Sequence, residues 1–153
     1  MGKLGREDVL LEIMRSYWGG MLKRGAVTFW EQFDPSAEGS DQYAMYGDPY
    51  GKSLCHAWGA SPNYLIARYL CGVAPVKPGY EKFKIEPLGI RCLDEFHAVV
   101  PVGRGNLAID WSDGTLTVCS DVEGGTLILK KQEYPVPANE VLQIKEEQFR
   151  SGN

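Results

Sequence analysis

A short stretch, Gly72-Val-Ala-Pro-Val-Lys-Pro-Gly79, divides this chain of 153 residues. Before it, apolar residues recur with a helical period, and after it they fall in short runs separated by turn residues. Its prolines and terminal glycines have the composition of a linker. The change of period predicts an α+β chain in which residues 1–75 are helical and residues 76–153 form an antiparallel β-sandwich.

Towards the N-terminus, residues 7–24 predict a helix. Pairs of apolar side chains recur every four positions, which places them on one broad face. Gly25 is suited to the C-cap of this helix. Gly19 and Gly20 interrupt the pattern and each costs about 1 kcal/mol against alanine, so we expect another part of the chain to approach the helix there.

A long polar loop, residues 34–52, precedes a second helical pattern over residues 54–71. The loop is rich in Pro, Gly, Asp and Ser, and loops of this length without regular structure are often functional. Pro62 either kinks the second helix or stands at the first position of its regular part. Gly72 ends it.

Aromatic residues concentrate in the helical part. Two such helices expose much apolar surface by themselves, and exposed apolar patches of this kind rarely stay bare. We therefore expect Tyr17, Trp18, Trp30 and Trp58 to form an exposed or self-associated apolar surface, at the place where helices of a missing N-terminal segment would pack.

Towards the C-terminus, six short runs predict strands. Asp113-Gly114 between two of them predicts a tight hairpin, and Glu123-Gly-Gly125 marks another tight connection. The runs are residues 82–86, 98–100, 106–111, 115–120, 126–131 and 141–144.

Charge and hydropathy exclude two classes of partner. The net charge is −4 with both signs mixed and no basic stripe, so we expect no nucleic-acid partner. No apolar run approaches the roughly 18 residues of a membrane span, so we expect no membrane partner. The N-terminus also lacks the pattern of a signal peptide, which favours a cytoplasmic location for this chain.

The four cysteines, Cys55, Cys71, Cys92 and Cys119, lie far apart without a C-x-x-C pair or a histidine cluster. We therefore expect no metal site and no cofactor. Free, mostly buried thiols in a reducing compartment are the simplest expectation.

Two aromatic-flanked polar residues are the candidates for chemistry. Glu31 follows Trp30 between a helix end and the polar loop, where an apolar setting can tune a carboxyl pKa for acid–base catalysis. His56 and Trp58 lie among small residues that leave room for a ligand. The structural alternatives are an exposed glutamate beside a core tryptophan and a core histidine bonded to a carbonyl.

Three motifs in order carry a resemblance to a known family: Tyr17-Trp-Gly-Gly-Met-Leu22, Gly25-Ala-Val-Thr-Phe-Trp-Glu31 and Tyr46-Gly-Asp-Pro-Tyr-Gly-Lys-Ser-Leu-Cys-His-Ala-Trp-Gly-Ala-Ser-Pro62. This series resembles the C-terminal part of the bacterial α-L-rhamnosidases, glycoside hydrolase family 78. The likeness covers about residues 9–120 and weakens beyond Cys119.

The resemblance implies the last helices of an (α/α)6 barrel over residues 1–75, followed by the family's C-terminal β-sandwich. It also implies an inverting hydrolase that removes terminal α-L-rhamnose from rhamnose-containing glycosides. Glu31 matches the family's general base, His56 looks like a sugar-contacting residue, and Trp30 and Trp58 are implied to line the pocket.

The chain departs from the family by lacking its upstream acidic, arginine-containing motif, which holds the general acid. Inverting hydrolysis needs two carboxyl groups, so we expect a C-terminal fragment that is inactive alone. Two alternatives stay open: a non-catalytic carbohydrate-binding or interaction module, and the tail of another six-hairpin glycosidase or glycoside phosphorylase.

Overall fold

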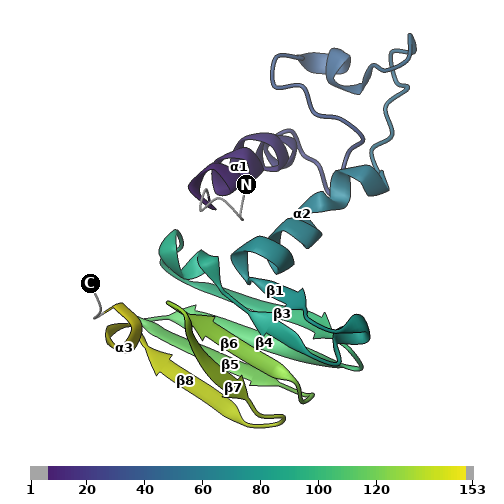
Figure 1. The fold of residues 1–153 in the computed structure, drawn as a ribbon. Coiled ribbons are helices and arrows are strands. Elements are labelled where there is room, and N and C mark those ends of the chain that lie inside the picture. The colour runs from purple at the N-terminus through teal and green to yellow at the C-terminus, as the bar shows by residue number, and fades with distance from the viewer. Residues whose placement is uncertain (1–6, 151–153) are drawn as a thin grey trace. The chain divides into compact units, whose positions relative to one another are not determined.

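In a computed structural model, which describes residues 7–150, the helical and the β patterns form different compact units (Figure 1). The first unit ends at Tyr64 and the second begins at Leu65, whereas the change of sequence period lies near residue 75. The chain is α+β, as predicted, with few helices and two antiparallel-rich sheets.

The first helix, α1 (Glu7–Lys23), ends as the sequence predicts. Gly25 has a φ of 85°, which an L side chain rarely adopts. The N–H groups of Gly25 and Ala26 donate to the carbonyls of Leu22 and Met21, each over 3.0 Å. This pair of bonds is a Schellman motif, which satisfies the last carbonyls of the helix.

The expectation that something approaches α1 at its glycines is confirmed at Gly20. A Cβ atom there would lie 2.4 Å from the ring of Phe33. Phe33 also donates its backbone N–H to the Tyr17 hydroxyl over 2.9 Å. The segment after α1 therefore packs back against the helix through one ring.

A small core holds the first unit together. Met21, Ala26, Trp30 and Phe33 are buried, with Tyr17, Trp18 and Tyr43 partly buried around them. The rings of Tyr17 and Phe33, and of Trp30 and Tyr43, meet edge to face, which is a favourable arrangement. The expectation of exposed surface is wrong for Trp30, because the chain folds over it.

The loop of residues 34–52 has local structure of its own. It contains a 3₁₀ helix, η2 (Gly39–Tyr43), and a tight turn in which Met45 and Asp48 exchange two backbone hydrogen bonds of 2.9 Å. The Arg24 guanidinium donates to the Ala37 carbonyl over 2.7 Å. The Arg24 bond ties the loop to the end of α1.

The predicted second helical stretch is confirmed over residues 57–70, and its α-helical part begins at Ser61-Pro62, one of the two alternatives expected, but it is not one regular helix. Residues 57–70 form three consecutive short helices of different pitch: η3 (Ala57–Ala60, 3₁₀), α2 (Ser61–Leu65) and η4 (Ile66–Leu70, a π-helix). The change to α geometry occurs at Ser61-Pro62, because Pro62 has no N–H to continue the preceding hydrogen bonds. In η4 the bond from the Cys71 N–H to the Ile66 carbonyl, 2.9 Å, skips the usual partner.

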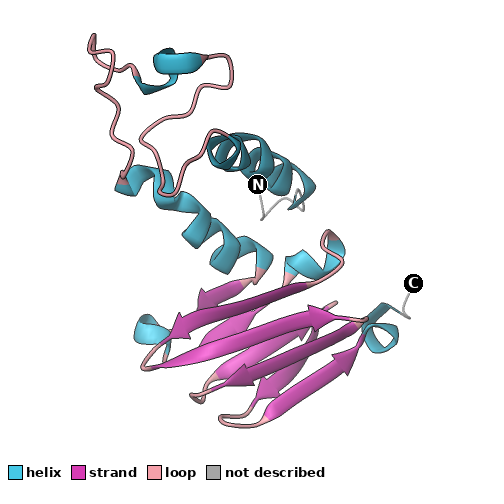
Figure 2. Cartoon of the chain, turned by 180° about the vertical axis from the view of Figure 1, so that it is seen from behind, coloured by secondary structure: helices cyan, strands magenta, loops and turns pink. Residues whose placement is uncertain are grey.

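Eight strands form the second unit, arranged in two four-stranded sheets (Figure 2). One sheet has the order β1-β2-β6-β7 and the other β3-β4-β5-β8, and only the β2–β6 pair is parallel. The bounds are β1 Val73–Pro75, β2 Phe83–Ile85, β3 Phe96–Val102, β4 Gly105–Ser112, β5 Thr115–Ser120, β6 Gly125–Leu129, β7 Gln132–Val136 and β8 Val141–Lys145. Short helices η5 (Pro78–Tyr80), η6 (Leu88–Arg91) and α3 (Glu146–Arg150) complete the unit.

One apolar core lies between the sheets. Alternate residues of β4, β5 and β6 are buried, as expected for strands with one face inwards. Both sheets contribute to one continuous cluster, which is the packing of a β-sandwich. Its buried members are Cys71, Val73, Phe83, Ile85, Ile90, Val100, Val102, Leu107, Ile109, Trp111, Leu116, Val118, Leu127, Leu129, Val136 and Ile144.

The sequence missed β1 and β7, and both contain a proline. Pro75 lies in β1, Pro135 in β7 and Pro101 in β3, and all three strands are sheet edges. An edge strand tolerates proline because one of its sides has no partner to bond. These three prolines therefore mark sheet edges.

Three connections between strands can be compared with their sequence signals. The predicted Asp113-Gly114 hairpin is confirmed, with both residues at positive φ. Lys130 and Lys131 form a second such turn between β6 and β7, although neither residue is typical of it. Gly124 lies instead on the crossing from β5 to β6, where a Cβ atom would meet the Glu81 carbonyl oxygen at 2.3 Å.

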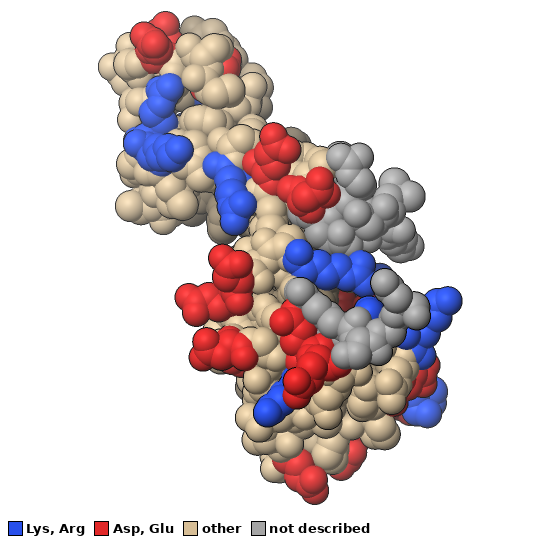
Figure 3. All heavy atoms as spheres, turned by 90° about the vertical axis from the view of Figure 1, so that its left-hand side faces the viewer, with Lys and Arg blue, Asp and Glu red and all other residues tan. Residues whose placement is uncertain are grey.

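Charged side chains of both signs are interspersed on the face of the molecule drawn in Figure 3. Within residues 7–150, no helix has the length and apolar character needed to cross a membrane. The four thiols are free, but only Cys71 is fully buried and Cys55 is exposed, so the expectation of mostly buried thiols is wrong. Burial raises the pKa of Cys71 to about 11.

Candidate active site

Two segments of the first unit lie side by side and carry the candidate residues. The Glu31 N–H donates to the Ser53 carbonyl over 2.9 Å, and the His56 N–H donates to the Phe29 carbonyl over 2.8 Å. The polar loop, residues 34–52, leaves after Glu31 and returns before Ser53, so both bonds lie at its base. Glu31 and His56 are therefore brought together by backbone pairing on either side of the loop.

Gly59 fixes how closely the returning chain can pack. A Cβ atom there would lie 2.4 Å from the Trp30 carbonyl oxygen, a contact that real Cβ atoms do not make. The Gly59 carbonyl accepts a 2.7 Å hydrogen bond from the Trp18 indole. A glycine is thus required where the turn after His56 meets the Trp30 backbone.

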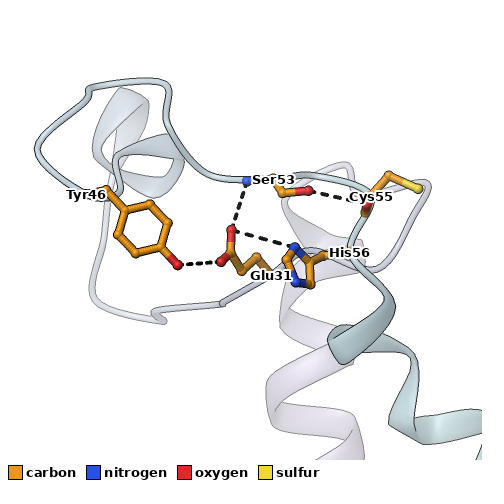
Figure 4. A network of polar contacts seen from close by, with 5 residues as sticks. All are labelled: Glu31, Tyr46, Ser53, Cys55 and His56. Carbon is orange, nitrogen blue, oxygen red and sulfur yellow. Dashed lines mark hydrogen bonds and ion pairs between the residues drawn. The ribbon is translucent and has the colours of Figure 1, made fainter.

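The Glu31 carboxylate is held at both oxygens (Figure 4). The Tyr46 hydroxyl donates to Oε1 over 2.6 Å, and the Ser53 N–H donates to Oε2 over 3.3 Å. His56 Nδ1 lies 3.8 Å from Oε2. The Glu31 side chain is 10% exposed and that of His56 is 27% exposed, so solvent reaches the pair from one side.

These contacts lower the pKa of Glu31 below its ordinary value of 4.5. The hydrogen bond from Tyr46 is the largest cause, while partial burial acts in the opposite direction. The Ser53 N–H and the nearby charges of His56 and Lys52 lower the pKa further. The carboxylate is therefore ionised at neutral pH.

Lys52 supports the site from below. Its side chain is buried, and its ammonium donates to the Gln42 carbonyl over 2.5 Å. The Lys52 N–H also donates to the Tyr43 carbonyl over 3.0 Å. Lys52 is thereby anchored to η2. This fixes the position of the next residue, Ser53, whose N–H donates to the Glu31 carboxylate.

The two remaining sequence candidates, Trp58 and Trp30, lie in different surroundings. The Trp58 ring is 81% exposed and meets the His56 ring edge-on, with the centroids 5.3 Å apart. Trp30 is only 3% exposed and packs in the core against Tyr43. The structure thus groups Glu31, His56 and Trp58 at the surface and places Trp30 beneath them.

Sequence reasoning missed Tyr46 as a partner of Glu31. Tyr46 is exposed and has a φ of 54°, in the tight turn that Gly47 completes. The signal was the Tyr46-Gly47-Asp48 run, which opens the third of the family-like motifs but otherwise indicates only a turn. A bulky residue at positive φ is uncommon and is often found at functional sites.

Comparison with known proteins relates the chain to a named protein. No protein-family model matches the chain. The chain is similar to a protein from Formosa agariphila named α-L-rhamnosidase, with 28% identity over 138 residues. The match covers 88% of this chain but spans only 14% of that protein's length. The chain is therefore related to a segment of a protein that is named as a glycosidase.

Proposed function

We propose that Glu31 is the general base of an inverting glycoside hydrolase that removes terminal α-L-rhamnose. The observation that carries this proposal is the Glu31 carboxylate, which Tyr46 and Ser53 hold ionised 3.8 Å from His56. The similarity to a protein named α-L-rhamnosidase supports the choice of sugar.

In this mechanism Glu31 takes a proton from water as the water attacks the anomeric carbon from the face opposite the leaving group. His56 donates a hydrogen bond to a sugar hydroxyl, and the exposed Trp58 ring packs against the C–H face of the sugar. Trp30 supports the Glu31 backbone from the core.

The general acid is proposed to come from outside this chain. An inverting pair stands about 6.5–9.5 Å apart, with one carboxyl group on each side of the bond that breaks. The match to only 14% of the relative and the missing acidic motif both support an acid from another part of a longer enzyme. The same proposal takes the helices of residues 1–75 as the last helices of an (α/α)6 barrel.

An exchange experiment tests the role of Glu31. This chain replaces the matching segment of the Formosa agariphila relative, and hydrolysis of an aryl α-L-rhamnoside is measured. We expect the exchanged protein to release rhamnose first as the inverted anomer. Glu31→Gln should lower kcat by at least about a hundredfold, since general-base catalysis contributes factors of that size.

Glu38→Gln is the matched control, because Glu38 is an exposed glutamate of the same loop. Adding azide to a Glu31→Ala variant should restore turnover and yield a rhamnosyl azide of inverted configuration, since azide needs no base. Full activity of Glu31→Gln, or a retained anomer, would show that the assignment is wrong.

A further inference from the structure

The outer face of the sheet β3-β4-β5-β8 carries an ordered row of polar side chains. The strand register aligns His97, Asp110, Thr117 and Gln143 across the four strands. His97 Nδ1 lies 3.5 Å from Asp110 Oδ2, and the Gln143 amide donates to the Thr117 hydroxyl over 3.4 Å. The row, called the ladder below, thus consists of two contacting pairs of polar side chains aligned on one face.

A hollow of about 680 Å³ lies over three residues of this ladder, Asp110, Thr117 and Gln143. The Glu146 N–H donates to the Gly114 carbonyl over 2.8 Å, which joins α3 to the β4–β5 turn as a wall at one end. The outer face of an antiparallel sheet is commonly polar. A flat face would not be closed at one end, as this hollow is by α3. The hollow is lined by Asp110, Ser112, Asp113, Thr115, Thr117, Gln143, Lys145 and Gln148.

The lining chemistry selects the class of ligand. Hydroxyl and amide groups can both donate and accept, and they outnumber the two carboxylates and one ammonium. Pockets for apolar small molecules have mostly apolar walls, so the ligand here must be polar over its surface. An anionic ligand would meet two carboxylates. A neutral, polyhydroxylated molecule fits this lining best.

The next row along the strands is apolar. Val99, Ala108, Cys119 and Val141 are aligned by the same register, and Val99 and Val141 are 57% and 63% exposed. The two rows are about 7 Å apart, since each residue of a strand rises about 3.4 Å. A sugar chain has this double character, with C–H faces for the apolar row and hydroxyls for the polar one.

We propose that this face, defined by the polar row and the apolar row, is a second carbohydrate site that binds a neutral glycan chain. Four strands span about 14 Å from first to last, which gives room for more than one sugar unit. The site lies wholly in the second unit. It does not depend on Glu31 or on the proposed hydrolysis.

Sugar titrations of the 153-residue chain, followed by amide NMR, test the proposal. The probes are a neutral rhamno-oligosaccharide, a neutral gluco-oligosaccharide and an acidic oligogalacturonate. We expect at least one neutral probe to shift signals of residues 108–119 and 141–145, and the acidic probe to bind more weakly. Thr117→Val with Gln143→Leu should weaken binding about tenfold, since two lost hydrogen bonds are together worth about 1.4 kcal/mol.

Thr126→Val is the matched control, because Thr126 lies in β6 of the other sheet. It should leave the affinity unchanged, as should Glu31→Gln. The proposal is overturned if no neutral probe shifts these signals, or if the double variant binds as tightly as the natural chain. It is also overturned if Val99 and Val141 shift only with protein concentration, since the face would then be a contact between copies.

Discussion

Tyr46 makes the largest contribution to the lowered pKa of Glu31. Its hydroxyl reaches Glu31 from a turn in which Tyr46 has the unusual φ of 54°. This backbone conformation costs about 1–2 kcal/mol. The same hydrogen bond raises the pKa of Tyr46 itself, so the phenol stays a donor at neutral pH.

Removing that hydroxyl should raise the pKa of Glu31. Tyr46→Phe deletes the largest cause of the lowered value, while the partial burial that opposes it remains. An NMR titration of the Glu31 carboxyl signal measures the shift. Tyr50→Phe, in the same loop, is the control and should leave the Glu31 titration where it is. An unchanged value in Tyr46→Phe would contradict the hydrogen bond.

The lowered pKa of Glu31 also predicts a pH dependence of stability. A carboxyl group whose pKa is lower folded than unfolded stabilises the fold above the unfolded value, which is about 4.3, and this contribution is lost as the pH falls through the folded value. The free energy of unfolding of Glu31→Gln should therefore fall less steeply below pH ~4 than that of the natural chain. Acid titrations of urea unfolding midpoints provide the comparison.

Among the elements, α1 offers two neighbouring glycines in different surroundings. A Cβ atom at Gly19 has only the Met14 carbonyl oxygen nearby, at 3.9 Å, whereas one at Gly20 would meet the Phe33 ring. Gly19→Ala should stabilise the chain by about 1 kcal/mol through helix propensity. Gly20→Ala should destabilise it, because the ring must leave the core. Thermal unfolding of both variants decides, and equal effects would mean that Phe33 does not pack there.

The β6–β7 hairpin should become more stable with glycine in its turn. Lys131 has a φ of 71°, at a position where this turn type strongly favours glycine. Lys131→Gly is expected to raise the free energy of unfolding by about 1 kcal/mol, because the positive φ then carries no steric penalty. Lys131→Ala removes the same charge but keeps the Cβ atom, so it should give no such gain in urea denaturation.

The elements show which parts of the fold a sequence can reveal. The Gly25 cap, the Asp113-Gly114 hairpin and the strand Thr115–Ser120 follow from local rules and are confirmed. The Lys130-Lys131 turn could not be predicted, because tertiary pairing imposes it against local preference. The three-part helix at residues 57–70 was read as one helix, because apolar spacing alone does not distinguish 3₁₀, α and π pitch.

The site was predictable only in part for the same reason. Glu31 and His56 stand out as polar residues beside aromatic ones in the sequence, and the structure places them in contact. Tyr46 reaches Glu31, and Lys52 comes near enough to lower its pKa, only because the loop closes through backbone bonds between distant residues. No local pattern encodes that closure. Trp30 was placed wrongly at the surface, because its burial depends on Tyr43 packing over it.

On the scale of the whole chain, the unit boundary can be tested by truncation. Residues 65–153 contain the sandwich core with Cys71 and Val73, and should fold alone. A piece of residues 76–153 loses both side chains and β1, so its stability should be lower by about 3 kcal/mol or more.

Trp111 reports on both pieces. It is buried and is the last tryptophan of the sequence, so neither truncation contains another. Its fluorescence in urea should show one cooperative transition for residues 65–153, at a higher midpoint than for residues 76–153. Equal midpoints would place the boundary at the change of sequence period instead.

The edge prolines bear on how the chain behaves at high concentration. Fibrils and strand exchange grow where an outer strand offers free backbone groups to a second molecule. Pro75, Pro101 and Pro135 each remove one backbone N–H from an outer strand. Of the four outer strands, β8 is the one without a proline. We therefore expect intermolecular β-assembly, when the protein is crowded or partly unfolded, to be seeded at residues 141–145 rather than at any other border of the sandwich.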